Sequence, residues 1–241
     1  MRYATLLILL FSFLFSSCSL FSKASPEVEP AVLHYPDPDP EINALIEAYR
    51  DSLRGVYGRT IAEIEDTLRF QKPEGELTNL VSDALRFRAA RELRRFVHIG
   101  VVNESSFNLY FLPGELTLKD VYDFMPYQNH LVVLEVDGST VRDLVKEVAA
   151  YGGAPISGVR FSIGENGEAM GILVDAEVLR ENERYLIATT SFLADRNGPF
   201  QALWDSESRT DLHHVGIREL YADYFRNSYQ LRAERDGRIR R

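Results

Sequence analysis

The sequence predicts a single α/β (α+β) domain with a mixed sheet flanked by helices. Segments whose apolar residues have helical spacing alternate with short apolar runs typical of buried strands, and there is no internal repeat. Hydrophobic residues make up 45% of the 241 residues and charged residues 26%, which is ordinary for a globular protein. A chain of this length can bury a core without disulfides or metals.

The formal net charge of −9 limits the classes of partner. Nucleic acids bind basic faces because their phosphate backbones are anionic, and anionic lipid surfaces attract polybasic patches. We therefore expect no nucleic-acid partner and no docking on a membrane through a basic patch.

The N-terminus is typical of a targeting segment. Residues 4–15, ATLLILLFSFLF, are too short to span a bilayer and have the size of a secretory hydrophobic region. The stretch FSSC at its end resembles a bacterial lipoprotein signal, in which the chain is cut before a cysteine that carries lipid. Residues 1–18 are therefore expected to be a lipoprotein signal peptide ending at Cys18. This predicts a lipid-anchored protein of the bacterial cell envelope, on the periplasmic side or at the surface. The alternative is an ordinary signal peptide that ends in cysteine.

A proline-rich tether is expected next. Residues 19–40 contain five prolines, each of which removes a backbone donor and restricts the preceding residue. This composition favours an extended segment between a lipid and a domain. The folded domain is expected over residues 41–241, which contain no cysteine and therefore no disulfide or thiolate chemistry.

The first elements of this domain are predicted to be a helix, a strand and a second helix. The segment 40–58 has one helical stripe of apolar residues and closes at a glycine. The segment 60–70 alternates between apolar and polar residues, as a strand does, and 75–93 returns to helical spacing. The apolar stripe of the first helix consists of Ile42, Leu45, Ile46, Tyr49, Leu53 and Val56.

Further strands and helices alternate along the rest of the chain. The run 96–103 predicts a buried strand, and 117–125 a short helix that ends at Pro126. After a strand and a DG turn, a helix is expected with Ser139 as N-cap and Gly152 as its stop. The remaining predicted segments are the strand 130–138, its following helix 139–153, paired strands around an ENG turn over 158–179, the buried strand 184–193 and an amphipathic helix over 215–227.

The sequence has no self-contained catalytic motif. It has neither a GxSxG nucleophile elbow nor a phosphate loop of the GxxxxGK type. No histidine has a carboxylate or another histidine at the spacing of a helical metal site, so each is interpreted as a structural or surface residue. These residues are His34, His98, His130, His213 and His214. We accordingly expect no catalytic residue, no metal and no cofactor.

Six short motifs in series resemble the C-terminal domain of 5'-nucleotidases. EGELTNLVSDALR, residues 74–86, is similar to the E-x-x-L-G-N-L-x-x-D-A segment of that family. It is followed in the family's order by VVNESSFN, LPGELTLKDVYDFMPYQNHLVVLEVDGSTVRDLV, PISGVRFSI, RYLIATTSFLADRNGPFQAL and DGRI. The order and spacing agree over about residues 42–240. Each motif alone is weakly specific, whereas the six together are specific.

This resemblance implies a substrate-binding role in nucleotide catabolism. The complete enzymes hydrolyse their substrate with two metals in an N-terminal calcineurin-like phosphoesterase domain, and their C-terminal domain stacks the base between two aromatic rings. This chain resembles only the C-terminal domain and has no D-x-H or G-N-H-E metal motif. It is therefore expected not to be catalytic alone, and the expected partner is a separate two-metal phosphoesterase subunit.

The resemblance also assigns the substrate-binding residues. The base would stack on Tyr127 and Phe192, and the open alternative is that both rings belong to the core. The N-x-G-G-x-R loop becomes NESSFN, so that its first asparagine is Asn103 and its arginine is replaced by Asn108, which cannot form a bidentate pair with phosphate. Glu104 would repel an anion. The expected set is Asn103, Asn108, Tyr127, Asn129, Phe192 and Asn197.

Three functions from different classes follow. The first is a substrate-binding or accessory part of a hydrolase system whose metallophosphatase lies on another chain. The second is a stand-alone lipoprotein that binds a nucleoside or another uncharged aromatic ligand. The third is a degenerate domain kept for protein–protein contact.

Replacing Cys18 by Ala should abolish lipid attachment, because this residue supplies the thiol that carries the lipid. Metabolic labelling with a radioactive fatty acid, followed by membrane fractionation, should show an unlabelled chain that is uncut or soluble. Normal processing and unchanged membrane partitioning of the variant would contradict the lipoprotein signal.

Overall fold

The computed structural model describes residues 39–108, 110–228 and 230–241. Cys18 and the tether up to residue 38 lie outside the described residues. Residues 46–241 form one compact unit, and the described residues before Ile46 belong to another. The helices are α2 (Pro40–Tyr57), α3 (Glu76–Leu93), α4 (Leu118–Phe124), α5 (Gly138–Ala150), α6 (Ser191–Ala194) and α7 (Ile217–Ser228), with the 3-10 helices η1 (Glu104–Ser106) and η2 (Gln201–Asp205). The strands are β1 (Thr60–Ile64), β2 (Leu68–Arg69), β3 (Ile99–Val101), β4 (Tyr110–Phe111), β5 (Gly114–Thr117), β6 (His130–Asp137), β7 (Ile156–Ser157), β8 (Val159–Ile163), β9 (Ala169–Val174), β10 (Glu177–Val178), β11 (Arg184–Thr190), β12 (Ser208–Gly216), β13 (Gln230–Leu231) and β14 (Ile239–Arg240).

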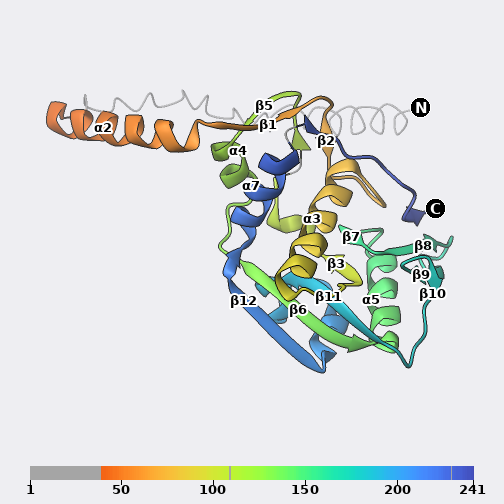
Figure 1. Cartoon of the computed structure of the whole chain (residues 1–241). Coiled ribbons are helices and arrows are strands. Elements are labelled where there is room, and N and C mark those ends of the chain that lie inside the picture. Colours follow the sequence, from red (N-terminus) through yellow and green to blue (C-terminus); the bar gives the residue numbers. More distant parts are fainter. Residues whose placement is uncertain (1–38, 109, 229) are drawn as a thin grey trace, which may run out of the picture. The chain divides into compact units, whose positions relative to one another are not determined.

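A mixed sheet of five strands, in the order β12-β6-β11-β3-β7, lies at the centre of the compact unit (Figure 1). β11 and β3 are parallel, whereas β6 is antiparallel to both β11 and β12. Smaller sheets have the orders β10-β9-β8-β14, β13-β1-β5 and β2-β4. The predicted α/β class with a mixed sheet is confirmed.

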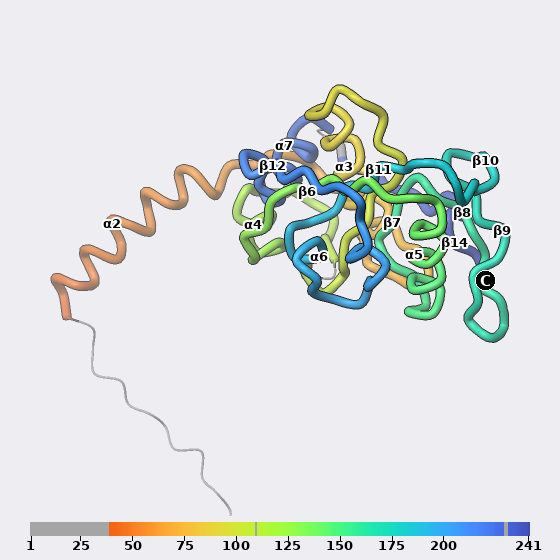
Figure 2. The backbone as a smooth tube through the Cα atoms, turned by 90° about the horizontal axis from the view of Figure 1, so that it is seen from below, coloured from red at the N-terminus to blue at the C-terminus, as the bar shows by residue number. Residues whose placement is uncertain are grey.

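Both faces of the central sheet are covered, and alternate residues of its strands supply two hydrophobic cores. Leu131 and Val133 of β6 belong to the core that contains the buried residues of α3, α4 and α7. Val132 and Leu134 belong to the other core, with those of α5. Figure 2 shows α3 and α7 on one side of β6 and β11, and α5 and α6 on the other. Successive side chains of a strand point to opposite faces, which explains why β6 is apolar at four successive positions, Leu131 to Leu134.

Helix α2 forms where it is predicted, but none of its residues is buried. The exposed fractions of its apolar stripe run from 44% at Ile46 to 65% at Tyr49. The spacing of apolar residues therefore predicts the helix correctly and does not predict its burial. Within the described ranges of the chain, no helix is both long enough and apolar enough to cross a membrane.

The N-cap of α5 differs from the prediction. The cap is Asp137, whose Oδ1 accepts a hydrogen bond from the backbone N of Thr140 at 2.8 Å. Ser139 donates its hydroxyl to the same carboxylate oxygen at 2.8 Å instead of capping the helix itself. The helix begins early, at Gly138, because an acidic residue at the end of β6 can both finish the strand and cap the next element. Gly152, with φ of +84°, follows the helix as its predicted stop.

A polar cluster fastens the C-terminal segment to the start of α3. Glu74 Oε1 accepts hydrogen bonds from Asn79 Nδ2 and from the backbone N of Asp236, both at 2.7 Å. The guanidinium of Arg238, which is 8% exposed, donates to the two carboxylate oxygens of Asp83 at 3.0 and 2.9 Å. Asp236 contacts the same guanidinium at 3.1 Å. We call Glu74, Asn79, Asp83, Asp236 and Arg238 the C-terminal latch.

Replacing Asp83 by Ala should destabilise the domain by about 2–3 kcal/mol, because it removes two charge-assisted hydrogen bonds from a buried guanidinium that keeps Asp236 and the Ile156 carbonyl as its partners. Urea denaturation followed by circular dichroism measures this loss. The control is Asp143→Ala on α5, whose carboxylate is 54% exposed and pairs with Lys146, and which should change stability by less than about 0.5 kcal/mol. Equal losses in the free energy of unfolding for the two substitutions would show that the C-terminal latch does not stabilise the domain more than a surface ion pair does.

Candidate functional site

Three connections meet where the carboxyl ends of β3 and β11 finish, and we call this end of the central strands one edge of the central sheet. β3 and β11 are parallel, so the loop after Val101 and the segment after Thr190 leave the sheet at the same edge. β6 is antiparallel to β11, with Leu131 opposite Thr190, so the residues just before β6 lie at that edge too. The topology therefore gathers the three segments that carry all six predicted substrate-binding residues. Ligands of α/β proteins bind at such an edge.

The loop after β3 is held by its own side chains. Asn103 is 4% exposed and precedes η1. Its Nδ2 donates to Ser105 Oγ at 2.8 Å, and its Oδ1 accepts from Ser106 Oγ at 3.0 Å. These two serines stand where the related family has glycines, and they use both polar groups of the Asn103 amide. Asn103 therefore shapes this loop.

The charges beside this loop are paired. Glu104 Oε1 lies 3.4 Å from Lys72 Nζ. Lys72 also lies 3.5 Å from the centre of the Tyr151 ring and donates to the Tyr151 carbonyl at 3.1 Å. Asn108 is exposed, and its amide donates to the carbonyl of Asp123. The expected repulsion of an anion by Glu104 is thus reduced by a lysine that the sequence motifs do not reveal.

The two aromatic residues have different surroundings. The Tyr127 side chain is 56% exposed, so the core alternative does not hold for this ring. Phe192 is partly buried and packs against the core that contains α5. The exposed ring of Tyr127 remains available to stack on a ligand. The ring of Phe192 packs against the core and is partly accessible to solvent.

Asn129 and Asn197 stabilise the segments on either side of Phe192. Asn129 Oδ1 accepts a hydrogen bond from Ser191 Oγ at 3.2 Å, which ties the segment before β6 to the start of α6. Asn197 is exposed, and its Nδ2 donates to the carbonyl of Asp195 at 3.3 Å. The turn at Asn197 is completed by Gly198, whose φ of +82° favours glycine. The amide groups of both asparagines lie at the edge described above.

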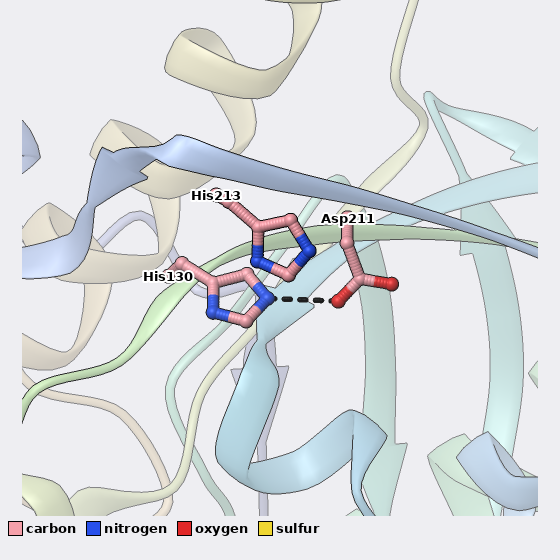
Figure 3. A group of neighbouring side chains, drawn as sticks. All are labelled: His130, Asp211 and His213. Carbon is pink, nitrogen blue, oxygen red and sulfur yellow. Dashed lines mark hydrogen bonds and ion pairs between the residues drawn. The ribbon is translucent and has the colours of Figure 1, made fainter.

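The same edge holds a polar cluster that sequence reasoning missed. His130 begins β6, and Asp211 and His213 lie near the end of β12 (Figure 3). His130 Nε2 is 2.8 Å from Asp211 Oδ1, and the two histidine rings are 4.3 Å apart between centroids. Two hydrogen bonds from Arg209 hold the pKa of the Asp211 carboxyl at about 2, so this group is an anion at neutral pH. A search for helical spacing cannot find residues that meet across a strand pair.

Comparison with known proteins decides the family. The family model for the 5'-nucleotidase C-terminal domain matches residues 57–205, more than half of the chain. The chain belongs to the 5'-nucleotidase C-terminal domain family. NAD 5'-nucleotidase of Haemophilus influenzae is 28% identical over 142 residues, which are 51% of this chain and 23% of that protein. The resemblance inferred from the six motifs is confirmed.

Solved structures of full-length nucleotidases share the fold. A 5'-nucleotidase precursor from Thermus thermophilus superimposes with a TM-score of 0.71 at 21% identity, over 82% of this chain and 42% of that one. The NAD nucleotidase of Haemophilus influenzae gives a TM-score of 0.63 at 16% identity, over 85% of this chain and 42% of that one. This 5'-nucleotidase C-terminal domain thus spans less than half the length of the relatives that it matches.

Replacing Tyr127 by Ala should leave the free energy of unfolding within about 0.5 kcal/mol of the unmodified protein, because the ring is mostly in solvent. Phe192→Ala should cost about 1–2 kcal/mol, because this ring contributes to a core. Urea denaturation of both variants measures the difference. A loss for Tyr127→Ala as large as that for Phe192→Ala would show that Tyr127 has a structural role and is not a free stacking surface.

Proposed function

We propose that this protein is the substrate-binding or accessory part of a nucleotide-catabolising hydrolase system whose two-metal phosphoesterase is on another chain. The observation that carries the proposal is the gathering of the three family loops at one sheet edge, with the exposed ring of Tyr127 among them. In this proposal the lipid on Cys18 holds the protein at the cell envelope. The domain then presents its ligand to the phosphoesterase at the same membrane.

Stacking supplies the binding energy in this proposal. A base that stacks on an aromatic side chain gains about 1–3 kcal/mol, and this gain does not depend on a phosphate. Tyr127 offers an exposed ring, and the accessible part of Phe192 offers a second apolar surface. The relative named NAD 5'-nucleotidase makes adenine compounds the first ligands to test.

The phosphate of a nucleotide would contribute little to binding. Asn108 replaces the arginine of the family loop, so a charge-assisted hydrogen bond of about 1.5–3 kcal/mol becomes a neutral one of about 0.5–1.5 kcal/mol. Lys72, a cation beside the loop, is already paired with Glu104. We therefore infer a preference for nucleosides or bases over nucleotides.

A second candidate is a stand-alone nucleoside-binding lipoprotein. The exposure of Tyr127 favours it, because an open stacking ring can hold an uncharged ligand without a partner enzyme. The two candidates differ in their dependence on a phosphoesterase. A separately encoded two-metal phosphoesterase from the same organism should bind this domain, or turn over nucleotides faster in its presence, only under the first candidate.

Calorimetric titration of adenosine, adenosine monophosphate and NAD into the protein tests the ligand class. Adenosine should bind at least as tightly as its monophosphate. Asn108→Arg should strengthen binding of the monophosphate by about tenfold and leave adenosine unchanged, because it restores the guanidinium. The control is Asn166→Arg, which adds the same charge to the exposed turn between β8 and β9.

Tighter binding of the monophosphate by the unmodified protein would contradict the preference for nucleosides. An equal gain from Asn108→Arg and Asn166→Arg would show a general charge effect and not a restored phosphate site. If none of the three compounds binds, with or without the phosphoesterase, both ligand-binding candidates fail and a domain kept for protein contact takes their place.

A further inference from the structure

The cluster of His130, Asp211 and His213 faces one side of the central sheet. β6 and β12 are antiparallel, and Asp211 is opposite Val132. Opposite residues of such a pair share a face, and so do residues two positions apart on one strand. His130, two residues before Val132, and His213, two residues after Asp211, are therefore brought to the face that Asp211 occupies. Leu212 pairs with Leu131 and Gly216 with His130, so His213 lies in an irregular stretch of β12 directly beside the first residue of β6.

One ligand atom from each side chain lies within 4.8 Å of the other two (Figure 3). Zinc bound to histidine nitrogen and carboxylate oxygen at about 2.0–2.2 Å places neighbouring ligand atoms about 3.3 Å apart. His130 Nε2 and Asp211 Oδ1 are 2.8 Å apart, at hydrogen-bond distance. A cation that replaces this hydrogen bond needs a small separation of these two groups and a rotation of the exposed His213 side chain.

The surroundings of Asp211 support a metal ligand. Arg209 donates to both carboxylate oxygens at 2.8 Å; Oδ2 keeps a further lone pair for a cation, and on Oδ1 a cation would take the place of the hydrogen bond to His130. Metal-binding carboxylates are commonly oriented by such an outer hydrogen bond. The positive charge of Arg209 is offset by Asp195, 2.8 Å from its Nη1. Two carboxylates and one guanidinium leave one negative charge beside the two imidazoles.

The donor set indicates the class of metal. Imidazole nitrogen suits zinc and its neighbours among the transition metals, whereas magnesium and calcium prefer sites made of oxygen. Three protein ligands leave one tetrahedral position for water or another molecule. Ser191 Oγ, which accepts a hydrogen bond from the backbone N of His130 at 3.2 Å, connects this cluster to the segment that carries Phe192.

We propose that His130, Asp211 and His213 form a binding site for one divalent transition-metal cation of the zinc class, with one coordination position open. The site fastens the end of β12 to the start of β6 at the ligand edge of the sheet. It is independent of the nucleoside site proposed above, because it uses none of the residues assigned to the ligand.

Titration of Zn²⁺ into the full-length protein, kept in detergent solution because of its apolar first residues, tests this site. Isothermal calorimetry should give one Zn²⁺ per chain, and the same concentration of Mg²⁺ should give no binding. His213→Ala should weaken Zn²⁺ binding at least tenfold, and so should His130→Ala. Zn²⁺ should also raise the melting temperature of the unmodified protein and not that of His213→Ala.

The matched control is His214→Ala. His214 is next to His213 and 67% exposed, but its Nε2 lies 3.1 Å from Glu92 Oε2, outside the cluster. Its removal should leave the affinity for Zn²⁺ unchanged. His213→Ala should leave the protein folded because the side chain is exposed. The proposal is overturned if the unmodified protein binds no Zn²⁺, or if His213→Ala and His214→Ala weaken binding equally.

Discussion

The pairing of β6 with β11 is the interaction on which the rest of the structure depends. It runs without interruption over seven residue pairs, from Asp137 opposite Arg184 to Leu131 opposite Thr190. Both strands are apolar on both faces, so each contributes to the core with α3 and to the core with α5. A slip of one residue would exchange the two sets of side chains between faces that require different volumes. The register is therefore fixed by the packing of two cores at once.

This pairing also places the three segments that carry the proposed ligand-binding residues. Because β6 and β11 are antiparallel, the beginning of one lies beside the end of the other, and the parallel pairing of β3 adds a third connection at the same edge. Thr190 ends β11, and its side chain accepts a hydrogen bond from the backbone N of Leu193 as the cap of α6. Ser191 then joins α6 to Asn129 on the other connection. The directions of the strands bring the three segments to this edge, and side-chain hydrogen bonds then hold the segments together.

The cationic side chains Lys72 and Arg209 at this edge are paired with carboxylates of the protein. Lys72 pairs with Glu104, and Arg209 pairs with Asp195 and Asp211. A phosphate that approaches these groups meets cations that already have partners, which reduces what it can gain. A cation that approaches the histidines meets a group with one excess negative charge. The same arrangement therefore disfavours an anionic ligand beside the first loop and favours a cationic one beside β12.

The first motif of the resemblance, at the start of α3, has a structural use. Glu74, Asn79 and Asp83 all contact the segment from Glu234 to Arg238 through the C-terminal latch. The motif can therefore persist in a domain whose ligand loops have changed, because the contacts that it makes hold the fold together. This separates evidence for the family, which the motif supplies, from evidence for a ligand, which must come from the loops.

The sequence by itself determined the fold class, the family and the positions of the helices α2, α3, α4, α5 and α7 and of the strands β1, β3, β6, β8, β9 and β11, because apolar spacing and turn residues are local signals. It did not predict β12, a strand of the central sheet whose residues are mostly polar and exposed. It also identified the three loops, including Asn108, which the family resemblance aligns with an arginine. Only the tertiary structure decided that Tyr127 is exposed, that the stripe of α2 is unburied and that Asp137 rather than Ser139 caps α5. It alone brought Lys72 to Glu104, and His130 to Asp211 across 81 positions of the chain. Such contacts depend on strand register and on whether neighbouring strands are parallel or antiparallel. Neither can be predicted from the local spacing of residues.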